Sequence, residues 1–222
     1  AITSLEDSIL DAGDAIVIPG LVDLQVNGAM GWGFQSIHQK HYDDILRYHL
    51  KHGTTTLLPT LITAPASILL ESLQTLVAYI NSDTLTTLPG IHLEGPFLAP
   101  EKSGAHDKSA LCLPDLTLAR RLYEASDSKL MMTTLAPELP GAEEVITCFS
   151  GQGVIVSAGH SAAKYREMQK AIKAGLSFVT HAGNASDWPH RSMGNLGFMT
   201  SEPGVVGTFL SEPVLGGGII LD

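Results

Sequence analysis

Two hydrophobic patterns take turns along the 222 residues of the chain. Short apolar runs rich in β-branched residues are typical of buried strands, and stretches with apolar residues three or four positions apart are typical of amphipathic helices. We expect strands at residues 15–28, 54–62, 88–96, 129–138, 154–161 and 176–185, with another starting at 216–222. The helices predicted between them cover residues 41–53, 64–82, 115–126, 141–153 and 162–175.

Strands that alternate with helices and read as nearly continuous apolar runs imply a parallel sheet covered by helices. Six such units and the start of a seventh predict an α/β fold, a (β/α)8 TIM barrel truncated after the start of its seventh strand. An open doubly wound sheet is the alternative, and it is disfavoured because no G-x-G-x-x-G follows the first strand. On this interpretation residues 1–16 are the remnant of an N-terminal accessory β region or linker, and residues 17–222 are an incomplete barrel.

Polar residues stand where the predicted strands end. Because the carboxyl ends of parallel strands meet at one mouth of a barrel, we expect these side chains to converge. Alternation of side chains along the strands supports this convergence, because it places His160 on one face with Val156, and His181 on one face with Val179. The strand-end residues are Gln25, Asn27, His92, Glu94, His160, His181 and Asn184.

One carboxylate and two imidazoles from three strands form a common ligand set for a zinc-like ion. Glu94, His160 and His181 are the candidate ligands, and a cation would explain a buried glutamate that otherwise needs to protonate. A single histidine at a strand end is more often a hydrogen-bonded core residue, and His92 is assigned to that role.

Charge and composition exclude several classes of function. The net charge of −10 leaves no basic excess to meet phosphates, which argues against nucleic-acid or membrane-surface binding. No apolar run reaches the roughly 20 residues that span a bilayer. The two cysteines form no disulfide framework, so we expect a reducing, cytoplasmic location.

The segments IPGLVDLQVNG, GIHLEGPFLAPEKSGAHD, LAPE, SAGHSAA and THAGNAS together resemble the N-acetylglucosamine-6-phosphate deacetylases of the amidohydrolase superfamily. The resemblance implies a metal-dependent TIM barrel that hydrolyses N-acetylglucosamine 6-phosphate to glucosamine 6-phosphate and acetate in amino-sugar catabolism. It also implies a homodimer with one divalent ion per chain, zinc in first place and iron, manganese or cobalt as alternatives.

The same resemblance assigns roles to single residues. Glu94, His160 and His181 match the metal ligands, and His106 matches a histidine that polarises the scissile carbonyl. Asn184 and Ala185 match a pair that holds the sugar phosphate. Arg191 lies near the place of a phosphate-binding arginine that reaches in from the neighbouring subunit. Residues predicted to bind substrate are Ala105, His106, Asn184, Ala185, Arg191 and Asp222.

The chain also departs from the pattern of this family. Gln25 and Asn27 lie near the metal where many amidohydrolases carry H-x-H, which resembles the single-metal branch. Ser186 replaces a usual methionine, and the loop that follows is changed. The general-base aspartate is expected beyond Asp222, so the chain itself contains no catalytic base. We therefore keep three alternatives: an N-acetylgalactosamine-6-phosphate deacetylase, a hydrolase of another amide such as a cyclic ureide, and an inactive sugar-phosphate-binding fragment.

Overall fold

A parallel sheet covered by helices forms the body of the molecule. The computed structural model describes residues 11–35, 38–82, 88–187, 189–193 and 199–220. The strands of the main sheet are Leu21–Val26 (β1), Thr54–Leu61 (β4), Ile91–Glu94 (β5), Leu130–Leu135 (β6), Ile155–Ala158 (β7), Leu176–Val179 (β8) and Gly216–Gly217 (β11). The helices are Lys40–Lys51 (α1), Ala66–Ser82 (α2), Leu116–Ala125 (α3), Ala142–Gly151 (α4), Tyr165–Ala174 (α5) and Val205–Ser211 (α6).

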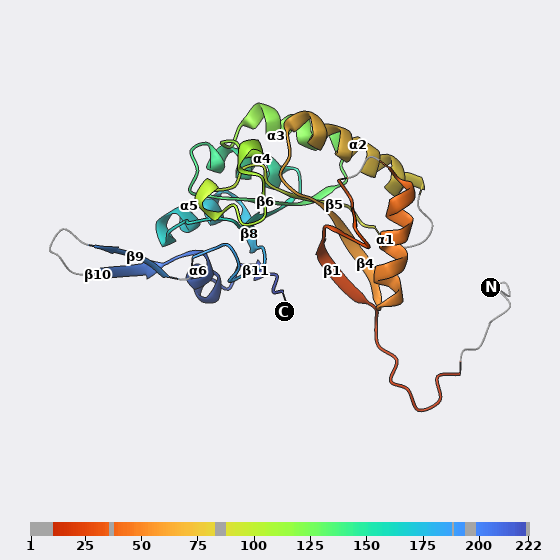
Figure 1. Ribbon diagram of the computed structural model, residues 1–222. Helices are drawn as coiled ribbons and strands as arrows, with labels where there is room; N and C mark the ends of the chain where they lie inside the picture. The colour runs from red at the N-terminus through yellow and green to blue at the C-terminus, as the bar shows by residue number, and fades with distance from the viewer. Residues whose placement is uncertain (1–10, 36–37, 83–87, 188, 194–198, 221–222) are drawn as a thin grey trace, which may run out of the picture.

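The order of the strands decides between the two predicted architectures. Every strand of the main sheet lies beside the preceding one, in the order β1-β4-β5-β6-β7-β8-β11, and all of these pairings are parallel. Right-handed crossovers that always advance in one direction place their helices on one side of the sheet. Helices α2 to α5 indeed lie along the outer side of the curved sheet (Figure 1). The prediction of a parallel, helix-covered sheet is confirmed, and the doubly wound alternative is wrong.

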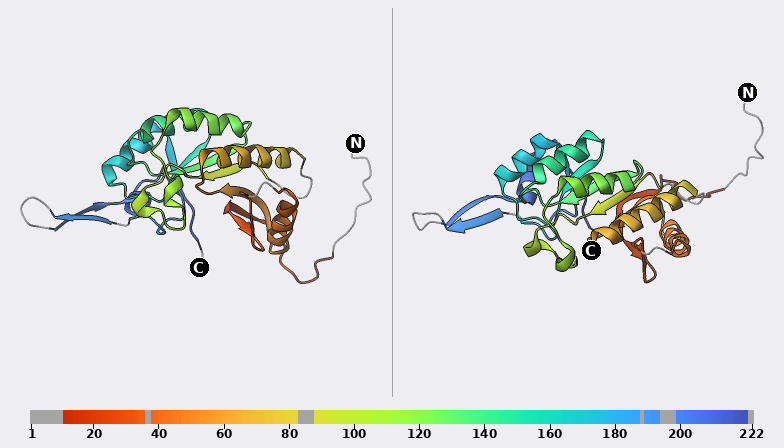
Figure 2. Two further views of the ribbon diagram at one scale, coloured as in Figure 1. Left: turned by 45° about the horizontal axis from the view of Figure 1, so that its top comes forward. Right: turned by 90° about the horizontal axis from the view of Figure 1, so that it is seen from above.

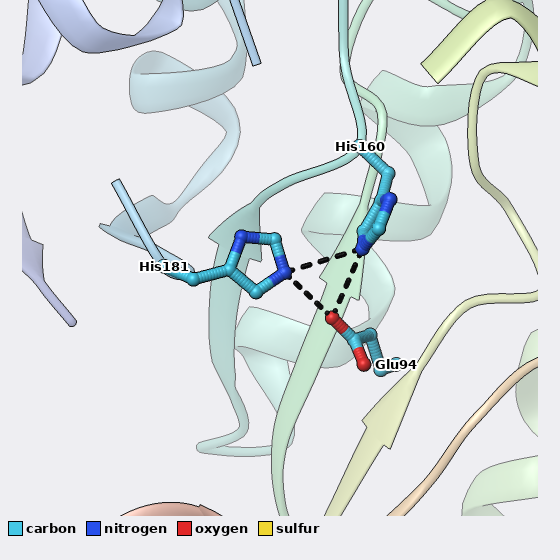
Figure 3. Close-up of side chains that lie close together, drawn as sticks. All are labelled: Glu94, His160 and His181. Carbon is cyan, nitrogen blue, oxygen red and sulfur yellow. Dashed lines mark hydrogen bonds and ion pairs between the residues drawn. The ribbon is translucent and has the colours of Figure 1, made fainter. Parts of the chain in front are cut away.

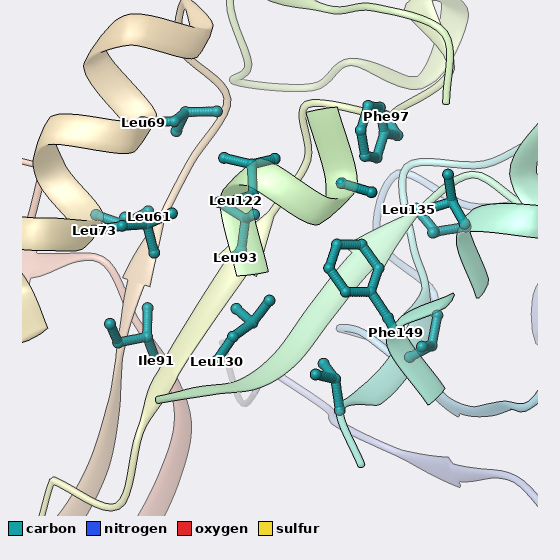
Figure 4. Packing of buried hydrophobic residues seen from close by; sticks show 14 of the residues in the cluster. Leu61, Leu69, Leu73, Ile91, Leu93, Phe97, Leu122, Leu130, Leu135 and Phe149 are labelled. Atoms are coloured by element: carbon teal, nitrogen blue, oxygen red, sulfur yellow. The ribbon is translucent and has the colours of Figure 1, made fainter. Parts of the chain in front are cut away.

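The hydrophobic core lies between the helices and the outer face of the sheet. Leu93 of β5 and Leu135 of β6 pack there with Leu122 of α3 and Phe149 of α4, and all four are fully buried (Figure 4). Burying a leucine or phenylalanine side chain contributes about 1.5–3 kcal/mol, so this layer contributes strongly to the stability of the fold. Asp115 caps the N-terminus of α3, because its carboxylate accepts a hydrogen bond from the N–H of Leu118.

The inner face of the sheet is polar. The Nε2 atom of His92 lies 2.8 Å from the hydroxyl of Thr134, which lies 2.6 Å from the hydroxyl of Thr180. The hydroxyl of Ser157 continues this chain at 2.5 Å from Thr180. Burial lowers the pKa of His92 to about 4, although the nearby charge of Glu94 opposes that shift. His92 is therefore a neutral member of a buried hydrogen-bond network, which agrees with the core role predicted for it.

Some predicted elements differ from the observed ones. Residues 15–20 form no strand, because the apolar side chains of residues 16–18 are exposed and β1 begins only at Leu21. Of the strand predicted at residues 216–222, the described residues 216–220 contain strand only at Gly216 and Gly217, which pair with β8. Residues 11–16 carry only a turn, and residues 1–10 and Asp222 lie outside the described residues.

Short elements join or follow the predicted ones. The antiparallel hairpin Pro189–Met193 (β9) and Met199–Pro203 (β10) projects from the body of the molecule, and α6 follows it (Figure 2). The sequence of this hairpin shows no apolar alternation, so its period gave no strand signal. The other short elements are Gly28–Ala29 (β2), Trp32–Gly33 (β3), Pro100–Lys102 (η1) and Lys108–Ala110 (η2). None of the helices among the described residues is long and apolar enough to cross a membrane.

The two outer strands of the main sheet have edges that are unpaired within the described part of the chain. We therefore expect this chain to self-associate when it is produced alone. Among the described residues, β1 pairs only with β4 and β11 only with β8, and apolar side chains such as Val22 and Ile219 are exposed there at 64% and 69%. Unpaired edges with apolar side chains are templates for further strands. We expect the 222-residue chain to sediment above its monomer mass, increasingly with concentration.

A charge at the edge should oppose this association. Val22→Lys should raise the monomer fraction, whereas Leu113→Lys, at a similarly exposed site between η2 and α3, should not. A monodisperse monomer for the unmodified chain at all concentrations would contradict the prediction.

Candidate metal centre

Three side chains meet at the carboxyl ends of β5, β7 and β8. Glu94 is the last residue of β5, and His160 and His181 each follow the last residue of their strand by two positions. All three are buried, with 3%, 6% and 7% of their surface exposed. Their ring and carboxylate atoms face one another across the inner side of the sheet (Figure 3). The predicted convergence of these strand ends is thus present in the structure.

The three ligand atoms form a small triangle. The Oε1 atom of Glu94 lies 3.2 Å from Nε2 of His160 and 2.9 Å from Nε2 of His181, and the two nitrogen atoms are 3.2 Å apart. A tetrahedral zinc ion with bonds of about 2.0–2.1 Å separates its ligands by about 3.4 Å. The triangle therefore fits a small divalent ion with little movement, and the three residues form a group that could hold one.

Backbone conformation, rather than strand alternation, directs the two histidines. Val156 and Val179 pack in the core on the outer face, so alternation alone would send His160 and His181 outward with them. Both histidines instead have positive φ angles, 50° for His160 and 34° for His181. This turn of the chain brings both rings to the inner face. The predicted meeting point is right, and the alternation argument for it is wrong.

Left-handed conformations of residues other than glycine cost about 1–3 kcal/mol each and persist only where neighbouring contacts hold them. The carbonyl of His160 accepts a hydrogen bond from the N–H of Ala99, and its Nδ1–H donates to the carbonyl of Lys102 at 2.8 Å. The loop after β5 thus fixes both the backbone and the ring of His160. In a neutral ring, donation from Nδ1–H leaves the lone pair on Nε2, the atom that can bind a cation.

The electrostatics of the triangle favour an ionised carboxylate. Burial alone would raise the pKa of Glu94, but its interactions with His106, His160 and His181 outweigh burial and hold that pKa well below its usual range. Burial would lower the pKa of His181, but its hydrogen bond to Glu94 raises it. Within the described residues, Nδ1 of His181 is buried without a hydrogen-bond partner. The arrangement therefore presents a carboxylate that needs a positive partner.

His106 lies beside the triangle and is oriented by the loop after β4. Its Nδ1 accepts a hydrogen bond from the N–H of Thr63 at 3.3 Å and lies 2.8 Å from the hydroxyl of the same residue. A neutral ring with an accepting Nδ1 carries its proton on Nε2. That Nε2 lies 3.6 Å from Oε2 of Glu94, and the His106 ring packs edge-on against His160 at 4.4 Å. His106 can thus present an N–H donor next to the candidate ion.

The other predicted site residues are only partly gathered. Gln25 and Asn27 line a cavity of about 580 Å³ together with His92 and with His181 of the triangle. Ala105 is exposed next to the buried His106. Asn184 is exposed, and its backbone N–H donates to the carbonyl of His181.

Of the residues predicted to bind phosphate, Ala185 lies before β9 and Arg191 lies within it. Ala185 has a φ of 48°, and its carbonyl accepts a hydrogen bond from the N–H of Ser161. Arg191 lies in β9, where its backbone is opposite Ser201 of β10. The structure thus places Arg191 on the projecting hairpin, away from the strand ends that carry the triangle.

A family model described as the amidohydrolase family matches residues 16–206, most of the chain. The chain belongs to the amidohydrolase family.

Several relatives of this amidohydrolase chain carry the same name. The N-acetylglucosamine-6-phosphate deacetylase of Homo sapiens is 34% identical over 203 residues, which cover 88% of this chain and 49% of the relative. That of Bacillus subtilis (strain 168) is 32% identical over 206 residues, which cover 90% and 49%. The chain thus spans about half the length of the curated relatives it matches.

Solved structures lead to the same group of proteins. The crystal structure of N-acetyl-D-glucosamine-6-phosphate deacetylase from Mycobacterium smegmatis matches with a TM-score of 0.81 and 30% identity, over 91% of this chain and half of that one. A mutant of the Mycobacterium smegmatis protein, solved in complex with N-acetyl-D-glucosamine-6-phosphate, matches equally well. The resemblance read from the motifs is confirmed.

Sequence reasoning missed the residues that hold the amidohydrolase loops together. The carboxylate of Glu138, after β6, accepts hydrogen bonds from the hydroxyl of Ser161 and the N–H of Ala162. The ammonium of Lys102 pairs with Asp187 at 2.5 Å and joins the loops after β5 and β8. Glu138 is the last residue of the LAPE motif, so the motif pointed to it. Nothing in the sequence, however, indicates which groups its carboxylate binds.

The triangle predicts about one tightly bound divalent ion per chain. His160→Ala should remove it, because a carboxylate and one imidazole give too few ligands to compete with water. Metal analysis of the purified, zinc-loaded and dialysed protein measures this. His52→Ala, which removes an exposed histidine at the end of α1, is the matched control and should leave the metal content unchanged. Two tight ions per chain, or full occupancy in His160→Ala, would contradict the single site.

Proposed function

We propose that this chain is part of an N-acetylglucosamine-6-phosphate deacetylase. The observation that carries the proposal is the buried triangle of Glu94, His160 and His181 with the N–H of His106 beside it. The known proteins that the chain matches along most of its length bear this name. The reaction adds water to the acetamide carbonyl, breaks the C–N bond and releases acetate and the amino sugar 6-phosphate.

Glu94, His160 and His181 are proposed to hold one divalent ion, with zinc in first place and iron, manganese or cobalt as alternatives. Such an ion, when bound, lowers the pKa of a water molecule to about 7. Gln25 and Asn27 offer no imidazole near this position, which supports a single-metal site. The role of these two residues is to line the cavity beside His181.

His106 is proposed to donate a hydrogen bond from Nε2 to the oxygen of the scissile carbonyl. Thr63 supports this role because its N–H donates to Nδ1 and so keeps the proton on Nε2. A fixed donor that faces the developing oxyanion stabilises the transition state more than the ground state. The proton that leaves the water and reaches the amine requires a general base, and an aspartate beyond Asp222 is proposed for it.

The phosphate group of the substrate is assigned to the loop after β8. Gly183 and Ala185 have φ angles of 95° and 48°, a turn geometry of the kind that directs backbone N–H groups at an anion. The side chain of Asn184 and the N–H of Ala185 are proposed to bind the phosphate, and Ala105 and Asp222 to complete the substrate contacts. The projecting hairpin is proposed to carry Arg191 into the neighbouring subunit of a homodimer.

The proposed activity is tested by incubation of the full-length enzyme with N-acetylglucosamine 6-phosphate and measurement of released acetate. We expect zinc-dependent release that a chelator abolishes, because the triangle supplies the only grouped ligand set among the described residues. N-acetylgalactosamine 6-phosphate in a parallel reaction decides between the two epimers. Turnover of a cyclic ureide but of neither sugar phosphate would contradict the proposal, as would binding of both sugar phosphates without turnover.

Arg191 gives a test of phosphate recognition. Arg191→Ala should cost about 2 kcal/mol of substrate binding, or about 30-fold in KM, for N-acetylglucosamine 6-phosphate, because a charge-assisted partner is lost. KM for unphosphorylated N-acetylglucosamine should change little. Arg191→Lys should restore only part of the loss, since lysine cannot make two parallel hydrogen bonds. An equal effect on both substrates would show that Arg191 supports the fold instead.

A further inference from the structure

The carboxylate of Glu138 binds the chain that follows β7 and is not part of the metal triangle. It follows β6, and its side chain is half-buried. One oxygen, Oε2, accepts a hydrogen bond from the hydroxyl of Ser161 at 2.6 Å, and the other, Oε1, accepts one from the N–H of Ala162 at 2.6 Å. Both partners come directly after His160. Glu138 therefore holds the chain on the C-terminal side of His160 by two hydrogen bonds.

His160 depends on such hydrogen bonds because its backbone is strained. Its φ angle of 50° persists only where neighbouring contacts hold it. The loop after β5 holds the residue itself, through Ala99 and Lys102. Glu138 holds the two residues that follow. Loss of the second contact would free the turn to relax toward an ordinary conformation and would swing the imidazole away from Glu94.

Ser161 extends this support to the next loop. It is fully buried, its N–H donates to the carbonyl of Ala185 at 3.2 Å, and it forms a bridge to Ser186. Ala185 is itself strained, with a φ angle of 48°. The hydroxyl of Ser161 is the point at which Glu138 holds both loops, because the same residue bonds Glu138 through its side chain and Ala185 through its backbone.

We propose that Glu138 is a positioning residue that, through Ser161 and Ala162, holds the His160 imidazole in the metal triangle and the Ala185 turn in its phosphate-facing conformation. The metal part of this inference stands on the geometry of the triangle, and the phosphate part rests on the proposed function. Glu138 touches neither ion nor substrate; it acts through the two loops.

The test is zinc affinity of the purified protein, measured by competition with a chelator. Glu138→Ala removes both contacts and should weaken zinc binding about 10-fold or more, the effect typical of losing a group that orients a ligand. Glu138→Gln should stay within about 3-fold of the unmodified protein, since its amide accepts from Ala162 and can donate to Ser161. Burial raises the pKa of Glu138, so a neutral amide suits this environment.

Two further variants separate positioning from general stability. Asp115→Ala removes a carboxylate that also accepts a backbone N–H, that of Leu118 at the start of α3, but which does not bond Ser161. This matched control should leave zinc affinity unchanged. Ser161→Ala removes the hydroxyl that donates to Glu138 and accepts from the N–H of Ala163, so it should weaken zinc binding by itself. Combined with Glu138→Ala, it should weaken zinc binding by less than the sum of the two single effects, because the two substitutions share the Glu138–Ser161 link.

The outcomes are distinguishable from failure of the proposed function. If the unmodified protein binds no zinc, the metal site fails. If it binds zinc and Glu138→Ala binds equally well, the positioning role is overturned while the site stands. Equal weakening by Asp115→Ala overturns it as well, because the effect then reflects helix stability. Weakening by Glu138→Ala with recovery in Glu138→Gln supports it, whatever substrate the enzyme hydrolyses.

Discussion

The structure depends on one carboxylate that is buried at the end of a core strand. Glu94 is 3% exposed and faces two imidazoles at about hydrogen-bond distance. A carboxylate removed from water needs positive or hydrogen-bonding partners, or it takes up a proton. The fold supplies those partners from strands and loops that lie up to 87 residues away in sequence. The ends of β5, β7 and β8 are thus positioned so that their side chains surround the Glu94 carboxylate.

The two faces of the sheet divide stability and chemistry between them. Sequential winding places the helices on the outer face, where leucine, valine and phenylalanine side chains close the core. The inner face carries hydroxyls and a neutral histidine that bond one another below the triangle. A satisfied network of this kind fixes the register of neighbouring strands without adding charge. The network also holds His92 close to Glu94, while His92 stays outside the triangle of Glu94, His160 and His181.

The strand-end loops support one another rather than standing alone. The loop after β5 binds the ring and backbone of His160, and its Lys102 pairs with Asp187 after β8. The loop after β6 reaches the chain after β7, which in turn bonds the loop after β8. Left-handed residues at His160, His181 and Ala185 persist in this setting because several contacts fix each turn. The geometry of the site is a property of the connected loops.

The sequence by itself determined the parallel, helix-covered sheet and the meeting of Glu94, His160 and His181, because hydrophobic period and the strand-end position of polar residues are local signals. It determined neither the exposed course of residues 15–20 nor the hairpin of β9 and β10, since these depend on which neighbours pair or pack with them. The direction of the two histidines was decided by tertiary structure alone. Alternation would have turned them outward, and contacts from a loop distant in sequence, those of Ala99 and Lys102 with His160, hold the chain after β7 in the conformation that turns His160 inward.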